Sequence, residues 1–190
     1  TTEIYTLSLH DALPILKCGS LNIVSSEEKA YLLSGESYFN NGDYPRAIEE
    51  FNKAMKVTTS EARVRNNLGI AYARMGFFEK AIEELKSVLR LEPTHSTARF
   101  NLGVTVCELS RKYIETGRLD NAINILKDVS RIIPDNPFPV STMGIIYVIQ
   151  DKKTEAMELL NKALSLCNSV QYASVKKSVE EELKNLKLPQ

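Results

Sequence analysis

The chain has 190 residues, of which 43% are hydrophobic and 25% are charged, and its formal net charge is zero because 24 Lys and Arg balance 24 Asp and Glu. This is the composition of an ordinary folded domain, which excludes extensive disorder, and the lack of a basic excess argues against nucleic-acid binding. No apolar run approaches the ~18–20 residues that span a bilayer. Two His and three Cys leave little for a metal centre, so we expect neither a metal nor a cofactor.

The first fifteen residues, TTEIYTLSLHDALPI, resemble the translation of a common short-read sequencing adapter. We therefore expect residues 1–15 to be a non-native segment and leave them out of the fold, as one would an expression scar. Residues 16–27 form an uncertain leader. Because the adapter-like segment replaces the native N-terminus, the sequence leaves export, lipid anchoring and an upstream domain open, and the cytoplasm is only the default localisation.

From about residue 28 the chain repeats a pattern of 34 residues. Gly35, Gly69 and Gly103 are spaced by this interval, and so are Gly42 and Gly76. Around these glycines the apolar residues recur at spacings of three and four, which predicts two amphipathic helices in each unit, joined at a glycine turn. No segment alternates apolar and polar residues with a period of two, so strands are not expected.

The third unit departs from this interval. Gly117 follows Gly76 by 41 residues rather than 34, which places seven additional residues between Gly103 and the turn. Seven residues make about two helical turns, so we expect the first helix of the third unit to be about two turns longer than its counterparts. In the same unit, Val106 stands where the second unit has the aromatic Tyr72.

The units share a set of side chains: a Leu-Gly pair or a variant of it, an aromatic residue three positions later, a turn glycine, an alanine in the second helix and a proline after it. The second unit is complete, with Leu68, Gly69, Tyr72, Gly76, Phe78, Ala81, Leu85, Val88 and Pro93. This pattern resembles the tetratricopeptide repeat (TPR) family over about residues 28–170. Thr59 stands where the family has proline, and Asp151 stands at the turn of the fourth unit.

The resemblance implies an all-α fold, a right-handed α-solenoid of about four helix-turn-helix repeats closed by a C-terminal capping helix. The expected TPR domain covers residues 28–187, with repeats at about 28–61, 62–95, 96–136 and 137–170 and the capping helix at 171–187. Ser25 and Glu28 are expected to open the first helix as a capping box. Within the hairpins, Gly35, Gly69, Gly103 and Gly144 are expected to face Ala47, Ala81, Ala122 and Ala156.

The resemblance also implies a function, that of a non-catalytic adaptor or scaffold which binds a peptide or a partner protein in the concave groove of the first helices. Asn67 and Asn101 occupy equivalent positions, and each amide can both donate to and accept from a peptide backbone. Arg63 and Arg74 would favour acidic side chains nearby. The full set of expected peptide-binding residues is Arg63, Asn67, Ile70, Arg74, Phe100, Asn101, Val104, Thr142 and Ile145.

No catalytic site is predicted. Cys107 and Cys167 are far apart in the sequence, and His95 has no Cys or His companion and is expected at the surface. The pair Glu83–Glu84 recurs at the repeat interval, as on a solvated outer face. The alternative function is an oligomerisation or regulatory arm of a larger protein, an enzyme among the candidates, whose upstream part is missing. Self-association therefore stays open, and the sequence determines neither the partner, the pathway, the source organism nor the oligomeric state.

Overall fold

The computed structural model describes residues 26–187, and every regular element in that range is helical. The expectations for the adapter-like segment, for most of the leader and for Ser25 lie outside the described residues. In chain order the elements are α1 (Ser26–Asn40), α2 (Tyr44–Val57), α3 (Glu61–Arg74), α4 (Phe78–Leu91), α5 (Ser96–Glu115), α6 (Leu119–Ile132), α7 (Pro137–Ile149), α8 (Lys153–Leu166), the short 3-10 helix η2 (Val170–Tyr172) and α9 (Ala173–Lys187).

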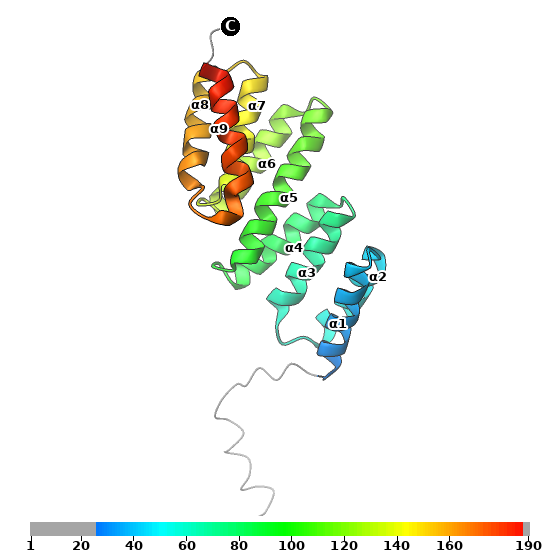
Figure 1. The fold of residues 1–190 in the computed structure, drawn as a ribbon. Helices are drawn as coiled ribbons and strands as arrows, with labels where there is room; N and C mark the ends of the chain where they lie inside the picture. The colour runs from blue at the N-terminus through cyan, green and yellow to red at the C-terminus, as the bar shows by residue number, and fades with distance from the viewer. Residues whose placement is uncertain (1–25, 188–190) are drawn as a thin grey trace, which may run out of the picture.

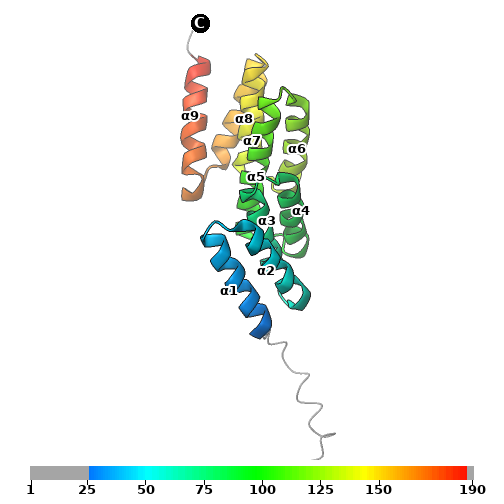
Figure 2. The ribbon, with the colours of Figure 1, turned by 90° about the vertical axis from the view of Figure 1, so that its right-hand side faces the viewer.

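The helices pack in successive pairs, α1 with α2, α3 with α4, α5 with α6 and α7 with α8, and each pair stacks on the next along the chain (Figure 1). In Figure 2, α1 and α9 lie toward one side of the molecule, while α4 and α6 lie on the other side of α3 and α5. The single helix α9 packs against α8 and α7 after the last pair. The expected all-α solenoid with a C-terminal capping helix is therefore confirmed.

The stacking buries one continuous side of each second helix. In α4, for example, Ala81, Leu85 and Val88 are completely buried, and they recur at spacings of three and four as an amphipathic helix requires. The buried side chains form two clusters that divide at α3: Leu68 joins the cluster of α1 and α2, whereas Ala62 joins the larger cluster that extends to Leu183 on α9. Because one pair cannot cover its own apolar side, each pair depends on its neighbours for burial.

The four turns within the pairs have the same geometry. At each turn one residue has a positive φ, namely Gly42 (78°), Gly76 (76°), Gly117 (71°) or Asp151 (57°). The N–H of the residue after it donates to the carbonyl of a tyrosine in the helix before the turn, at 2.8–3.0 Å. This is the hydrogen bond that ends a helix in the Schellman arrangement. The four tyrosines are Tyr38, Tyr72, Tyr113 and Tyr147.

This shared turn shows where the extra residues of the third unit belong. Helix α5 has 20 residues and α3 has 14, so the predicted lengthening is confirmed. Counted back from the turn, however, the counterpart of Tyr72 is Tyr113 rather than Val106, because Tyr113 accepts the hydrogen bond that closes this turn. The assignment of Val106 as a replacement for the aromatic residue was therefore wrong, and the additional turns lie before Tyr113.

Counting from the turn also changes which small residue of the third hairpin corresponds to Gly69. A methyl group added at Gly103 would lie 2.7 Å from the side chain of Asn136, so the expectation that Gly103 faces Ala122 was wrong. Ser110 stands seven residues before Gly117, as Gly69 stands before Gly76, and it is completely buried. In the first, second and fourth hairpins, the residues closest to the corresponding glycines are Phe51, Leu85 and Leu160, one turn after the expected alanines.

Two side chains in the linkers between the pairs cap the helices that follow them. His95 is half-buried, and its Nδ1 accepts the N–H of Ala98 at 3.2 Å as the N-cap of α5. Asn136 is buried and caps α7 by accepting the N–H of Phe138 at 3.0 Å. Its Nδ2 also donates to the carbonyl of Arg99 on α5 at 3.0 Å. These caps fix the start of the two helices that follow the linkers.

Candidate ligand groove

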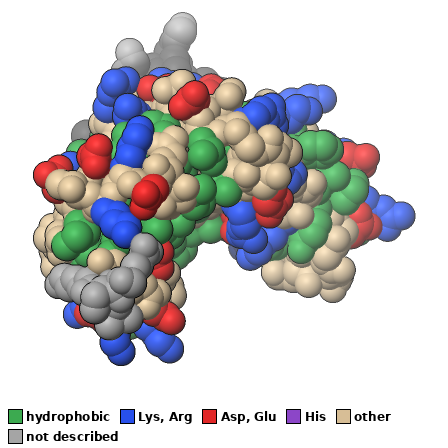
Figure 3. Space-filling view, turned by 90° about the horizontal axis from the view of Figure 1, so that it is seen from above, with side chains coloured by type: hydrophobic (Ala, Val, Ile, Leu, Met, Phe, Trp, Pro, Cys, Tyr) green, Lys and Arg blue, Asp and Glu red, His purple; other side chains and the backbone are tan. Residues whose placement is uncertain are grey.

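Two adjoining hollows lie on the first helices of the N-terminal three pairs. The first, of about 310 Å³, lies between α1 and α3 and is lined by Glu36, Phe39, Asn40, Phe51, Asn67 and Ile70. The second, of about 490 Å³, lies between α3 and α5, and Ile70 lines it as well. Because they share Ile70, we treat them as one surface and call it the groove. Seen from above, the molecule is hollowed between its C-terminal helices and the smaller N-terminal part on the right, with charged side chains at the edges (Figure 3).

Six of the nine predicted binding residues line the groove, which brings together side chains from α3 and α5. Asn67 and Ile70 line the first hollow, and the second is lined by Ile70 with Arg74, Phe100, Asn101 and Val104. Arg63 is absent from both linings, and its guanidinium lies 3.2 Å from the carboxylate of Glu36 on α1. The pair joins α1 to α3 at the surface, which leaves the Arg63 charge compensated.

The structure separates Thr142 and Ile145 from the groove. They line a different hollow of about 250 Å³, whose other wall includes Val175 and Val179 of α9. The hydroxyl of Thr142 donates to the carbonyl of Phe138 at 2.9 Å. The packing of α9 beside α7 thus gives these two residues a neighbour within the chain, and a ligand lying along α1, α3 and α5 would not reach them directly.

Asn67 and Asn101, which the sequence placed at equivalent positions, differ in their surroundings. Asn67 is half-buried and makes no hydrogen bond to another described residue, so its whole amide is free to bind a ligand. The Nδ2 of Asn101 instead donates to Oδ1 of the buried Asn66 at 3.2 Å. Part of the hydrogen-bonding capacity of Asn101 is therefore used to satisfy a buried polar group.

Phe100, which lines the second hollow, belongs to an aromatic cluster. The ring centroid of Phe100 lies 5.4 Å from that of Phe138 and 6.1 Å from that of Tyr172 in η2, and the last two rings are 5.8 Å apart. The sequence placed Tyr172 only within the expected capping helix at 171–187 and did not indicate this contact. No local periodicity signals it, because it joins residues more than 70 positions apart. The cluster joins α5, α7 and η2 beside the second hollow.

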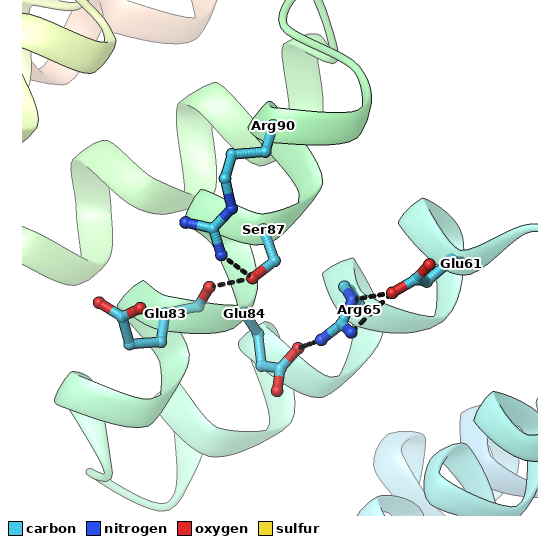
Figure 4. Close-up of polar contacts among 6 residues, drawn as sticks. All are labelled: Glu61, Arg65, Glu83, Glu84, Ser87 and Arg90. Carbon is cyan, nitrogen blue, oxygen red and sulfur yellow. Dashed lines mark hydrogen bonds and ion pairs between the residues drawn. The ribbon is translucent and has the colours of Figure 1, made fainter.

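Outside the groove, the charged and nucleophilic side chains make contacts within the fold. Arg65 of α3 lies between the carboxylates of Glu61 and Glu84, at 2.6 and 2.7 Å, and so ties α3 to α4 (Figure 4). Burial raises the pKa of the Cys107 thiol to about 12, and the Thr142 hydroxyl 2.9 Å from its sulfur only partly offsets this.

Within residues 26–187 there is no group of three or more His, Cys, Asp or Glu side chains that could hold a metal ion. In the same range no helix is both long and apolar enough to cross a membrane.

The comparisons with known proteins point to one family. Residues 35–76 match a model described as "TPR repeat", and residues 62–95 match one described as "Tetratricopeptide repeat". The comparison with curated proteins gives no match.

Several solved structures have a similar fold. MamA from Desulfovibrio magneticus RS-1 has a TM-score of 0.55 at 17% identity, over 86% of this chain and 90% of that one. YrrB has a TM-score of 0.51 at 22% identity, over 79% of this chain and 74% of that one. A tetratricopeptide repeat protein from Parabacteroides merdae ATCC 43184 has a TM-score of 0.55 at 19% identity, over 85% of this chain and 61% of that one.

Stacked helix hairpins of about 34 residues, with a groove along their first helices, define a helical repeat protein of the solenoid class. The hairpins, the turn geometry and the two matching models agree on the kind of repeat. The chain is a tetratricopeptide repeat protein. TPR domains are generally protein–protein interaction modules and are typically non-catalytic.

Proposed function

We propose that the chain is a non-catalytic adaptor that holds an extended segment of a partner protein in the groove between α1, α3 and α5. The observation that carries this proposal is the free amide of Asn67 beside the apolar Phe39 and Ile70 in a hollow of about 310 Å³. An amide that both donates and accepts can bind a peptide backbone, and the apolar neighbours can cover one of its side chains.

Two further observations favour an extended ligand over a compact one. The two hollows adjoin at Ile70, so that a strand-like segment could contact α1, α3 and α5 in succession. Phe100, which has ring contacts with Phe138 and Tyr172, adds an apolar contact in the second hollow for a ligand long enough to reach it. The solved YrrB structure, which has the same fold, is described as a TPR protein with an unusual peptide-binding site, which is consistent with this use of the architecture.

The test is a selection of random 12-residue peptides, displayed on phage, on the full chain. An enriched peptide is then titrated with the wild type, with Asn67→Ala and with the matched control Asn124→Ala, whose side chain is exposed on α6. One lost main-chain hydrogen bond of about 0.5–1.5 kcal/mol predicts an affinity lower by about two- to twelvefold for Asn67→Ala and no change for the control.

Asn101 is the weaker probe, because Asn101→Ala also leaves the buried Asn66 without a partner and so changes stability. A selection that enriches no peptide would contradict the proposal. So would a set of peptides that bind Asn67→Ala as tightly as the wild type.

A further inference from the structure

Two arginines from different helices line the second hollow. Arg74 is exposed at the end of α3 and makes no hydrogen bond or ion pair with another described residue. Arg111 lines the same hollow from α5, and its guanidinium pairs with the carboxylate of Glu108 one turn earlier. The hollow therefore has two positive charges and one negative charge, with the surplus on Arg74.

Helix α5 supplies the second arginine of this hollow. Counted back from the turn, Arg111 stands where α3 has Ile70, so the third unit has an arginine in place of an apolar residue. The next residue, Lys112, reaches back to α4, where its ammonium group lies 4.7 Å from the centre of the Phe78 ring. Arg111 and Lys112 thus add positive charge beside the second hollow, and the charge of Arg111 is paired with Glu108.

Half of the residues that line this hollow are apolar. Besides Phe100, Ile70 and Ala73 come from α3, Phe78 comes from α4, and Val104 comes from α5. A ligand that fits this lining has an apolar side chain for these residues and a carboxylate for the arginines. Since a guanidinium binds a carboxylate through paired N–H donors, Arg74 is suited to this second contact.

We infer that the groove selects extended segments in which an acidic residue stands within about two positions of an apolar one, with Arg74 as the residue that binds the carboxylate. This inference rests on the proposed function and adds the chemistry of the partner. The two contacts are close together, because Arg74 lies four residues beyond Ile70, which is about 6 Å along α3. An extended peptide rises about 3.3 Å per residue, so a segment that crosses α3 can make both contacts with residues no more than about two positions apart.

The ion pair between Arg111 and Glu108 predicts that one substitution should strengthen peptide binding. Replacing Glu108 by Gln removes the internal partner and frees Arg111 for the ligand. Because exposed pairs of this kind contribute little, the affinity for an acidic peptide should rise by only about 1.5- to 5-fold. A purely structural role of Glu108 would not produce tighter binding.

The peptides enriched on the full chain provide the test. Their sequences should show Asp or Glu within two positions of Leu, Ile, Val or Phe, and an enriched peptide should bind more weakly as NaCl rises from about 0.05 to about 0.5 M. Arg74→Ala should weaken such a peptide about 1.5- to 5-fold, and Arg74→Glu should shift the selected peptides toward Lys and Arg. The matched control is Arg90→Ala, an exposed arginine on α4 that bonds Ser87 (Figure 4).

The outcomes separate this inference from the proposed function. Peptides that depend on Asn67 but show no acidic preference and bind Arg74→Ala like the wild type would overturn the inference alone. A selection that enriches no peptide would overturn both.

Discussion

The hydroxyl of Thr58, in the linker between α2 and α3, donates a hydrogen bond of 2.6 Å to Oε1 of Glu28 in the first turn of α1. The other carboxylate oxygen accepts the N–H of Thr59 at 3.2 Å, and Glu28 is completely buried. The linker that leads into the second pair is thereby held against the beginning of the first. This explains why the proline expected at residue 59 is absent, since proline has no N–H to donate.

Glu28→Ala is expected to lower the free energy of unfolding by about 1.5–3 kcal/mol. The two hydrogen bonds to the carboxylate are lost, and the Thr58 hydroxyl and the Thr59 N–H are left without this acceptor. Glu27→Ala, at the exposed neighbouring position, should change it by less than about 0.5 kcal/mol. Urea unfolding measures both. Thr59→Pro is the complementary variant, and it would argue against the role of Glu28 if it were as stable as the wild type.

Asp151→Gly is expected to stabilise the protein. Asp151 has a φ of 57°, whereas the other three turns use glycine with φ between 71° and 78°. An L side chain is strained in this region, and removing the strain should raise the free energy of unfolding by about 0.5–1 kcal/mol. The reverse change, Gly42→Asp, has open space around it and should destabilise by a similar amount. Thermal unfolding followed by circular dichroism compares the two, and equal melting temperatures for all three proteins would contradict the expectation.

Gly103→Ala is expected to lower the free energy of unfolding by about 1–3 kcal/mol, because the new methyl group would lie 2.7 Å from the side chain of Asn136. That side chain is not free to move away, since it caps α7 and donates to the carbonyl of Arg99. A double-mutant cycle with Asn136→Ala isolates the clash, and the coupling should be about 0.5–3 kcal/mol, with the second change relieving the first. Additive effects would show that Gly103 and Asn136 do not meet.

The Cys107 thiol is expected to resist alkylation in the folded protein. Its pKa of about 12 leaves almost no thiolate at pH ~8.5, where an ordinary cysteine is about half ionised. Cys167, whose pKa is raised mainly by burial, is only half-buried and should react before Cys107. Iodoacetamide labelling followed by peptide mass spectrometry distinguishes the two sites.

The same shift has a consequence for stability. Above pH ~9 the unfolded chain loses the Cys107 proton while the folded chain keeps it, so the free energy of unfolding should fall as pH rises toward about 12. Cys107→Ser should lessen this fall, because an alcohol does not ionise in that range. Equal pH profiles for the two proteins would contradict the assignment of the shift to Cys107.

The sequence by itself determined the helices, the turns and the kind of repeat. The stripes around Leu68 and Leu85 and the glycines at 42 and 76 are local signals, because helix amphipathicity and a positive φ depend on residues within a few positions of one another. The longer α5 was predictable for the same reason. The 34-residue interval then indicated that the hairpins stack.

Only the tertiary structure decided which side chains meet. The register of α5 could be counted from Gly103 or from Gly117, and only the hydrogen bond from Arg118 to Tyr113 chose the second. The tertiary structure also decided which predicted binding residues already have a partner within the chain. Arg63 pairs with Glu36, Asn101 donates to Asn66, and α9 packs beside Thr142. These contacts join residues in different helices, and they depend on how the helices cross, which the local apolar pattern does not encode.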